Sequence, residues 1–403
     1  MSSVINPGTP LQGITVIDLG QIYLGPYATL LLAKAGASVI KVEPLAGEPA
    51  RTRGAVGKGG LLPLAMLNSN KRGITLNLKT ECGLQLLKEM VKRSDILVEN
   101  FAPGALDAIG VSFSALHQIN PRLIYASGSG YGLSGPDRDR LAMDVTVQAS
   151  SGVMSVTGFP DGPPLKAGIA VADFLGGIHL YAAIVTALYE REHTGIGRLV
   201  EVSMQEAIYP ALASNLGMKY NLGGKVPPRT GNRHGGLSIS PYNVYPAKDG
   251  HVAVACVVES HWPQLLEAMG REDLKSDSRF ISNVRRVENM DETDAVVEAW
   301  TRNLSKCEIM EITKRHRIPS APVRDLVEVM EDPHMHERGM LEWINHPELG
   351  HIVVPTTPLR LHGATKVQTV PSPALGEHNN EIYGGWLGLS EAEIADLKRS
   401  GVI

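Results

Sequence analysis

The stretch that decides the fold is ITVIDLGQIYLGPYATLLLAKAGASVIKVE, residues 14–43. It begins with a β-branched run at residues 14–19 and passes through a Gly- and Pro-containing loop at residues 20–26. A Leu- and Ala-rich segment at residues 27–35 ends at a glycine, and a second apolar run follows at residues 38–43. A strand, a short helix and a strand in this order predict a right-handed crossover between parallel strands.

The same alternation recurs further along the chain. A strand is expected at residues 73–78, a helix at residues 81–93, and further strands at residues 96–99 and 123–126. Alternating strands and helices are typical of an α/β domain with a parallel sheet. We therefore predict a doubly wound, Rossmann-like large domain.

A second, smaller domain is expected because 403 residues exceed one ordinary core. Residues 221–240 are rich in Gly, Pro, Arg, Asn and Ser, which indicates a boundary loop. The smaller α+β domain is expected to contain strands at 242–246 and 251–258 and helices within 262–315. A strand at 350–356 and a helix at 390–400 complete the chain. The predicted division is a large α/β domain at 1–220, a small α+β domain at 221–330, and a C-terminal part at 331–403 that returns to the large domain.

The composition places the chain among ordinary globular proteins. Apolar residues make up 43% and charged residues 20%, with a formal net charge of -4 and a pI near 6.4. Nothing in this balance favours nucleic acid or a membrane surface as a partner. The cysteines Cys82, Cys256 and Cys307 are scattered without metal-ligand spacing, and the N-terminus lacks the apolar region of a signal peptide. We expect a cytoplasmic protein without a metal site.

One carboxylate lies inside the longest apolar stretch, AGIAVADFLGGIHLYAAIVTALY at residues 167–189. The stretch is long enough to span a membrane, but Asp173, Gly176–Gly177 and His179 interrupt it and charges crowd residues 190–193. A buried helix with Asp173 near its N-terminus is therefore expected. Burying an unpaired carboxylate is costly, so a partner or a chemical role is required.

Two roles for Asp173 stay open on the residues alone. Asp is a favoured N-cap, where its oxygens accept the free N–H groups of the first helical turn. The same N–H groups and the helix dipole also keep a carboxylate ionised and fixed in place, as a nucleophile requires.

Dinucleotide binding is disfavoured by the first loop. Glu43 lies where a ribose-binding acid is found, yet the turn at residues 20–26 reads GQIYLGP and fails G-x-G-x-x-G. A literal match at residues 130–135 is followed by Pro136 and charges instead of a helix, so the required context is absent.

Nine strings in unbroken order resemble the class III CoA-transferase family, of the formyl-CoA transferase and carnitine CoA-transferase type. They are VIDLGQIYLGP, IKVEP, LNSNKRGITLNLK, VENFAPGALDAIGV, INPRLIYAS, SGYGLSGP, TGIGRLVEVSMQEA, SAPV and LGEHNNEI, besides the Asp173 segment. The resemblance implies an interlocked homodimer, each chain having a large α/β and a small domain. It also implies that Asp173 is the catalytic aspartate, which attacks an acyl-CoA thioester and forms an anhydride and then an aspartyl-CoA thioester.

The resemblance also carries over a set of binding residues. Tyr23 and Leu24 would line the thioester, and His234, Gly235 and Gly236 would belong to a glycine-rich loop that covers the acyl group. The positions that match CoA-contacting stretches are Leu76, Asn77, Leu78, Lys79, Asn100, Phe101, Ala102, Met143 and Asp144, with Leu141 and Ala142 before the last two. Alternation of Leu76 and Leu78 also suits a core strand, and Gly235–Gly236 also suits a hinge.

The sequence departs from the family pattern in ways that bear on substrates. Ala102 and Ala108 stand where relatives often carry a cation for the CoA phosphates, so that role would pass to Lys79, Arg72, Arg138 or Arg140. The glycine-rich loop has a single Gly pair, which weakens the case for formyl-CoA and oxalate as the substrate pair. Coenzyme A thioester is expected as a substrate, with no permanently bound cofactor.

Three alternatives to intermolecular CoA transfer stay open. An α-methylacyl-CoA racemase would need a His before Asp144, where Met143 stands. An intramolecular CoA-transferase would use the same machinery, and a silent CoA- or nucleotide-binding protein would use Asp173 only as a cap. For transfer, we expect a small carboxylic acid acceptor, such as succinate or a related dicarboxylate, with Arg229, Arg233 and His234 as candidate contacts.

Overall fold

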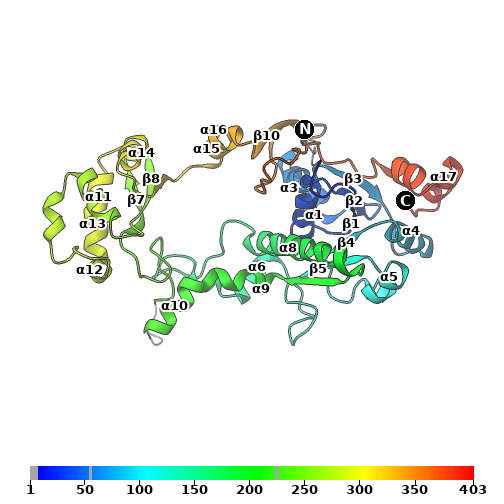
Figure 1. The fold of residues 1–403 in the computed structure, drawn as a ribbon, viewed down its shortest axis with the longest axis horizontal. Helices are drawn as coiled ribbons and strands as arrows, with labels where there is room; N and C mark the ends of the chain where they lie inside the picture. Colours follow the sequence, from blue (N-terminus) through cyan, green and yellow to red (C-terminus); the bar gives the residue numbers. More distant parts are fainter. Residues whose placement is uncertain (1–7, 54–56, 223–226) are drawn as a thin grey trace, which may run out of the picture. The chain divides into compact units, whose positions relative to one another are not determined.

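The computed structural model describes residues 8–53, 57–222 and 227–403. Figure 1 colours them by their position along the chain. Two compact units make up the chain. Unit 1 comprises Met1–Val147, Ile169–Ile208 and Asp332–Ile403, and unit 2 comprises Gln148–Gly168 and Tyr209–Glu331. Residues 223–226 of the predicted boundary loop lie outside the described residues. The predicted domain boundaries at residues 220 and 330 remain a prediction.

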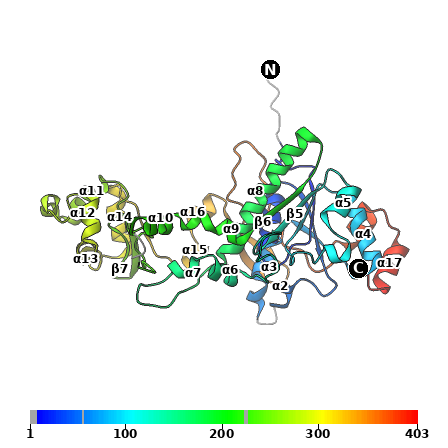
Figure 2. The same ribbon diagram turned by 90° about the horizontal axis from the view of Figure 1, so that it is seen from below.

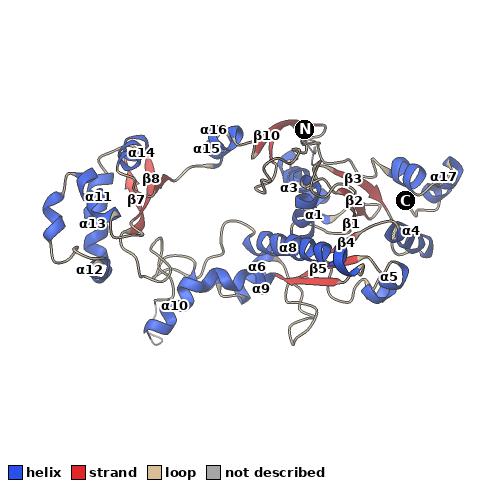
Figure 3. Ribbon diagram, in the orientation of Figure 1, coloured by secondary structure: helices blue, strands red, loops and turns tan. Residues whose placement is uncertain are grey.

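A six-stranded parallel sheet forms the centre of unit 1 (Figure 3). Its strands are β1 (Thr15–Asp18), β2 (Ser38–Glu43), β3 (Lys71–Thr75), β4 (Ile96–Glu99), β5 (Ile124–Ser129) and β6 (Leu199–Ser203). They are ordered β3-β2-β1-β4-β5-β6, and in the register Val16 pairs with Val39 on one side and Ile96 on the other. This order confirms the predicted Rossmann-like α/β fold, with its topological switch point between β1 and β4.

Helices cover both faces of this sheet, as Figures 1 and 2 show. On one face lie α1 (Leu24–Lys34) and α8 (Val171–Thr194), which pack on each other. Helix α1 also packs on β1, β2 and β4, and α8 packs on β5 and β6. On the other lie α4 (Glu81–Lys92) and α5 (Phe113–Ile119). Alternate strand residues such as Ile17, Ile40 and Leu97 form a buried core with Leu87 and Leu116 of these two helices.

Several predicted boundaries were wrong. The first helix begins at Leu24 rather than residue 27, because Gly25 and Pro26 fit the first helical turn, where the missing proline N–H costs nothing. The third strand ends at Thr75, since Asn77 donates its N–H to Val402 of the C-terminal segment. Strand β6 was not predicted from the sequence.

The C-terminal segment packs on the β3 edge of unit 1. After the hairpin of β10 (Leu341–His346) and β11 (Gly350–Pro355), a helical turn at Asn380–Trp386 and α17 (Glu391–Arg399) follow. Tyr383 donates its hydroxyl to the Thr75 carbonyl at 2.7 Å. The short helices of unit 1 are α2 (Pro49–Thr52), α3 (Leu62–Leu67), α9 (Met204–Ile208) and α16 (Pro333–Glu337), and α6 (Asp144–Ser150) begins in unit 1 and ends in unit 2.

Unit 2 is a smaller α+β unit. Its antiparallel strands are β7 (Tyr242–Ala247), β8 (Gly250–Ala255) and β9 (Ser320–Pro322), so the predicted strand at 251–258 ends three residues early. Its helices are α7 (Val153–Val156), α10 (Ala213–Leu222), α11 (His261–Met269), α12 (Asn283–Glu288), α13 (Met290–Thr301), α14 (Lys306–Arg315) and α15 (Leu326–Met330). Trp262, Phe280 and Val297 belong to its buried core.

Helix α8 is the one helix of the described residues whose length and apolar composition would let it cross a membrane. That test alone is weak, because buried core helices of globular proteins also pass it. In unit 1, α8 packs against α1, β5 and β6, and Leu180 and Ile184 on it are completely buried.

Candidate active site

The loop between β1 and α1 adopts a strained conformation at its centre. Ile22 has φ of 64°, a left-handed conformation that β-branched residues rarely adopt. Such backbone persists only where the surroundings hold it, and it is found mainly at functional sites. This loop, Gly20–Tyr23, is therefore the first element of the candidate site.

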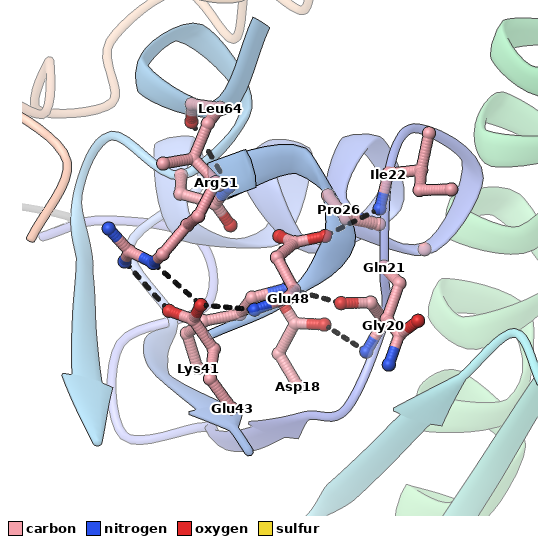
Figure 4. A network of polar contacts seen from close by, with 12 residues as sticks. Asp18, Gly20, Gln21, Ile22, Pro26, Lys41, Glu43, Glu48, Arg51 and Leu64 are labelled. Atoms are coloured by element: carbon pink, nitrogen blue, oxygen red, sulfur yellow. Dashed lines mark hydrogen bonds and ion pairs between the residues drawn. The ribbon is translucent and has the colours of Figure 1, made fainter. Parts of the chain in front are cut away.

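Side chains from strand β1 and from two neighbouring loops bind the peptide groups of this loop. Asp18 Oδ1 accepts the Gly20 N–H at 2.9 Å, and Glu48 Oε2 accepts the Ile22 N–H at 2.7 Å (Figure 4). Asn100 makes two hydrogen bonds to Gln21, accepting its N–H at 2.7 Å and donating to its carbonyl at 3.0 Å. Since Gln21 follows β1 and Asn100 follows β4, the pair spans the switch point of the sheet.

Buried ion pairs lie directly beneath the loop. Lys71 pairs with Asp18 at 2.9 Å and Lys41 pairs with Glu48 at 2.9 Å, and all four side chains are at most 1% exposed. Lys41 also donates to the Gly20 carbonyl. Burial raises the pKa of Asp18, but the ammonium groups of Lys71 and Lys41 outweigh it and lower that pKa below its usual value. Asp18 is therefore a charged member of the network.

A pocket of about 350 Å³ opens at the carboxyl ends of β1, β4 and β5. Its lining residues come from strand β5, from helices α1, α8 and α9, and from the loops at this edge of the sheet. They are Gln21, Ile22, Leu24, Asn100, Phe101, Ala102, Pro103, Gly128, Ser129, Gly130, Arg140, Leu141, Ala142, Met143, Asp173 and Met204. Parallel α/β sheets bind their ligands at this edge, beside the switch point. The pocket contains the carboxylate that the apolar stretch singles out.

Asp173 lies in the first turn of α8 and is 9% exposed. It is not the N-cap, because that position belongs to Ala170, which makes no side-chain cap hydrogen bond. The N–H groups of Ala172 and Asp173 are instead accepted by Asp144 Oδ1, at 2.8 and 3.3 Å. The capping role considered for Asp173 therefore belongs to Asp144, a residue 29 positions earlier in the chain.

The surroundings of Asp173 raise its pKa to about 7. Burial contributes most, and the negative charge of Asp144 raises the pKa further. The guanidinium of Arg53 and a hydrogen bond from the backbone of Leu24 act in the opposite direction. The carboxylate is thus more basic than a solvated Asp, and it is ionised at slightly alkaline pH.

Two glycines of α8 allow the helix to approach α1 closely. A Cβ on Gly177 would lie 2.9 Å from the Leu24 carbonyl oxygen, and one on Gly176 would lie 2.7 Å from Leu24 Cδ1. Neither distance is tolerated without movement. The small residues after Asp173 therefore bring its helix onto the N-terminus of α1, where Leu24 has no intrahelical partner for its N–H.

An aromatic cluster connects the start of α1 with the first turn of α8. The rings of Tyr23 and Phe174 stack with centroids 6.0 Å apart, and Tyr27 meets Phe174 edge-on at 4.8 Å. Arg53 donates to the Tyr23 hydroxyl at 3.0 Å, with its guanidinium 5.4 Å from the ring centroid. Sequence reasoning missed Arg53, because nothing in its local sequence sets it apart from surface arginines.

The structure places the predicted site residues in different surroundings. Leu24, Asn100, Phe101, Ala102 and Met143 line the pocket with Asp173. The stretch Leu76–Lys79 does not line it: Leu76 is buried in the core, Asn77 donates to the Gly401 carbonyl at 3.1 Å, Leu78 packs on the core and Lys79 is exposed. Leu76 and Leu78 are thus core residues, as the alternation allowed.

The predicted glycine-rich loop belongs to unit 2. There His234 Nδ1 accepts the Gly236 N–H at 3.2 Å, and the Gly235 carbonyl accepts from Asn215 at 3.3 Å. Two arginines near this loop are engaged. Arg229 donates to the Phe159 carbonyl at 3.1 Å, and Arg233 pairs with Asp294 at 2.7 Å and with Asp291 at 2.6 Å.

The basic residues considered for the CoA phosphates differ in their partners. Arg72 pairs with Glu381 at 2.8 Å and Arg140 with Asp137 at 3.1 Å, and Arg138 lies 3.6 Å from Asp139. Among them Arg140 lines the pocket. The acid considered for a ribose, Glu43, is 1% exposed and pairs with Arg51 at 2.7 Å, which is a structural role.

Another cavity of unit 1, of about 430 Å³, lies between α1, α8 and residues 356–367. Lys34 at its edge donates to Asn70 at 2.7 Å and to Thr369 at 2.8 Å. The described residues that line this cavity include no carboxylate. No cluster of metal-ligating side chains occurs among the residues that the structure describes. Asp173 is the one carboxylate among the described residues that line the pocket at the switch point.

Comparison with known proteins agrees with this geometry. The sequence profile of CoA-transferase family III matches residues 11–379. A formyl-CoA:oxalate CoA-transferase from Streptomyces coelicolor is 38% identical over 409 residues, covering 98% of this chain and 99% of that protein. A succinyl-CoA–D-citramalate CoA-transferase from Chloroflexus aurantiacus is 34% identical over 400 residues, with 98% and 99% covered.

A solved structure has the same fold. The crystal structure of a CAIB/BAIF family protein from Brucella suis superimposes with a TM-score of 0.81 at 33% identity, covering 94% of this chain and 99% of that one. The chain therefore belongs to CoA-transferase family III, and it is a CoA-transferase whose substrates are an acyl-CoA thioester and a carboxylate.

Proposed function

We propose that Asp173 is the nucleophile of an intermolecular CoA transfer to a small dicarboxylate. One observation carries the proposal: a carboxylate 9% exposed, with its pKa raised to about 7, lines a pocket at the switch point of the sheet. The carboxylate of Asp18, in the buried ion pairs beneath the loop, has the ammonium group of Lys71 as its partner. Asp173 instead experiences the negative charge of Asp144. Raised basicity strengthens a carboxylate as a nucleophile.

The reaction proceeds through two kinds of covalent intermediate. A carboxylate oxygen of Asp173 attacks the thioester carbonyl, the C–S bond breaks, and CoA leaves as the thiolate from a mixed anhydride. The thiolate then attacks the aspartyl carbonyl of the anhydride and releases the donor acid, which leaves an aspartyl-CoA thioester.

The acceptor completes the exchange by the reverse sequence. Its carboxylate attacks the aspartyl thioester, displacing CoA thiolate and forming a second anhydride. The thiolate attacks the acceptor carbonyl, so that the new acyl-CoA forms and the Asp173 carboxylate is regenerated. Water is neither consumed nor released, and the burial of Asp173 protects both anhydrides from hydrolysis.

The acceptor is proposed to be a dicarboxylate. The names of two relatives specify oxalate and D-citramalate, which are both dicarboxylic acids. In unit 1, Arg53 is the cation that acts on Asp173, and its guanidinium suits a second carboxylate of the acceptor. Arg229 and Arg233, the earlier candidates, bind carbonyls and carboxylates of unit 2.

Kinetic measurements on single substitutions show which of these arginines binds the acceptor. Arg53→Gln is expected to raise the acceptor KM for succinate about tenfold or more, and the KM for a monocarboxylate much less. If Arg229→Ala or Arg233→Ala has that selective effect and Arg53→Gln does not, the acceptor is bound from unit 2.

The remaining features follow the resemblance to the family. We propose that CoA extends over Asn100–Ala102 and Leu141–Asp144 toward Leu76–Lys79, with its phosphates near Lys79 and Arg140, and that the loop at His234–Gly236 covers the acyl group. The chain is proposed to be a cytoplasmic, interlocked homodimer that holds no permanent cofactor and binds neither nucleic acid nor a membrane.

Racemisation of α-methylacyl-CoA is the competing activity. It needs an acid and a base on the two faces of the α-carbon, and a histidine usually provides one of them. Among the described residues that line the pocket none is a histidine, and Met143 takes the place before Asp144. An intramolecular transfer between two carboxylates of one molecule would use the same nucleophile.

A mass-spectrometric experiment tests the function directly. The enzyme is incubated in D2O with succinyl-CoA, a chiral 2-methylacyl-CoA and a panel of free carboxylic acids. Movement of CoA to an added acid, with an aspartyl-CoA adduct mapped to Asp173 and absent in Asp173→Ala, is the expected result. Deuterium at the α-carbon of the 2-methylacyl-CoA without CoA movement would establish a racemase instead.

A further inference from the structure

The loop Gly20–Tyr23, between β1 and α1, lies next to the start of α8, which is distant from it in the sequence. Ile22 and Leu24 line the pocket with Asp173, and the Tyr23 ring stacks on Phe174, the next residue of α8. The loop is therefore part of the wall around the proposed nucleophile. Its backbone conformation determines where the N-terminus of α1 lies relative to Asp173.

The conformation of this loop is not favourable by itself. Ile22 is a β-branched residue at φ of 64°, a region in which glycine is usual. Asp18 provides a local contact, since it accepts the N–H of Gly20 two residues later. The peptides of Gln21 and Ile22 are held by two side chains that are distant along the chain, Asn100 and Glu48.

Glu48 is the member of this set that binds the strained residue itself. Its Oε2 accepts the Ile22 N–H at 2.7 Å, while its Oε1 lies 2.9 Å from Lys41 Nζ, and the side chain is 1% exposed (Figure 4). The backbone of Glu48 is held in turn, because Glu43 accepts its N–H at 3.0 Å. Because both of its oxygens are engaged and its side chain is buried, the Glu48 carboxylate does not contact solvent or substrate.

We infer that Glu48 and Asn100 are positioning residues for CoA transfer. Their hydrogen bonds to Ile22 and Gln21 keep Ile22 in its left-handed conformation. The N-terminus of α1 is thereby held next to Asp173. The inference rests on the proposed role of Asp173. Glu48 acts through the loop rather than on substrate. Asn100 also acts through the loop, from the end of β4 on the other side of the switch point. The buried pairs Lys41–Glu48 and Lys71–Asp18 fix the base of the same assembly.

A rescue experiment tests this inference. Glu48→Gln, whose amide is a poorer acceptor for the Ile22 N–H, is expected to lower kcat about tenfold while the KM for acyl-CoA changes less than threefold. Adding Ile22→Gly is expected to restore most of that loss, because glycine adopts a positive φ freely. Ile22→Ala removes the same side chain from the pocket but keeps the strain, and it is expected to restore nothing.

Amide hydrogen exchange of residues 19–27 provides a readout that does not depend on transferase activity. Glu48→Gln and Asn100→Ala should accelerate exchange in this segment at least fivefold. Lys34→Gln is the matched control, because it removes another buried cation of unit 1 whose partners are Asn70 and Thr369 rather than Glu43, Glu48 or the loop, and it should leave this exchange and kcat unchanged.

The outcomes separate the two proposals. If Gly and Ala at position 22 rescue Glu48→Gln equally, or if exchange at residues 19–27 is unchanged, the positioning role is wrong even though Asp173 forms the adduct. If the exchange and rescue occur but no adduct forms on Asp173, the loop is held as inferred and the proposed nucleophile fails.

Discussion

Asp144 Oδ1 accepts the backbone N–H of Asp173 at 3.3 Å, while the negative charge of the same carboxylate raises the pKa of the Asp173 side chain. One acid therefore fixes the start of α8 and tunes the acid that this helix presents to the pocket. The relationship joins residues 29 positions apart, and it makes the ionisation of the proposed nucleophile depend on a capping interaction.

The pH dependence of transfer should report the pKa of Asp173. Because the carboxylate must be ionised to attack, the pKa of about 7 predicts that kcat/KM falls about tenfold per pH unit below pH 7 and levels off above it. Stopped assays of CoA transfer between pH 5 and 9 measure the profile. A flat profile down to pH 5 would show that the nucleophile is not the buried acid with the raised pKa.

Substitution of Asp144 should shift that profile. Asp144→Asn removes the charge that raises the pKa of Asp173 but keeps an oxygen for the two N–H groups, so the acid limb should move to lower pH. Asp144→Ala removes the cap as well, and it should cost a further ~1 kcal/mol of stability. Thermal denaturation of both variants separates the effects, and equal Tm values would contradict the capping role.

The glycines of α8 predict an effect of helix spacing on activity. Gly177→Ala places a Cβ 2.9 Å from the Leu24 carbonyl oxygen and should push α8 away from α1, lowering stability by about 1–3 kcal/mol and kcat about tenfold. Gly217→Ala in α10 is the control, since its Cβ meets nothing within 4 Å and should raise stability by about 0.5–1 kcal/mol. Equal effects of the two substitutions would refute the close approach.

Glu99 predicts a pH dependence of stability rather than of rate. It is 6% exposed, it accepts the Phe101 N–H at 2.8 Å, and burial raises its pKa from 4.5 to about 7. A raised pKa means that the folded state binds the proton more tightly than the unfolded state. The stability that this proton contributes is complete below pH 4.5 and is lost as pH rises through about 7.

Glu99→Gln should therefore flatten the curve of Tm against pH. Between pH 5 and 8 the natural chain should lose on the order of 2–3 kcal/mol relative to Glu99→Gln, because each pKa unit corresponds to about 1.4 kcal/mol. Calorimetry at several pH values measures the difference. Parallel curves for the two proteins would mean that Glu99 is ionised in the folded state at neutral pH.

Local patterns were sufficient for much of the fold. The strand at Ile96–Glu99 and the helix at Glu81–Lys92 lie almost where their periodicity predicts, because each pattern repeats within a few residues. Strand β6 escaped prediction, since Leu199–Ser203 is an edge strand whose first four residues alternate between exposed and half-buried. The boundary of β3 was wrong because the C-terminal segment, distant in sequence, supplies the partner of Asn77.

The sequence by itself determined the parallel α/β architecture, the resemblance to a CoA-transferase family and the choice of Asp173 as the unusual carboxylate. Each of these depends on residue types at short spacing, or on strings that are read in order. Only the tertiary structure decided that Asp144 rather than Asp173 caps α8, that Asn100 binds Gln21, and that Glu48 holds Ile22. Those contacts join residues 26 to 79 positions apart, and hydrogen bonds between them exist only once the sheet has brought its loops together at one edge.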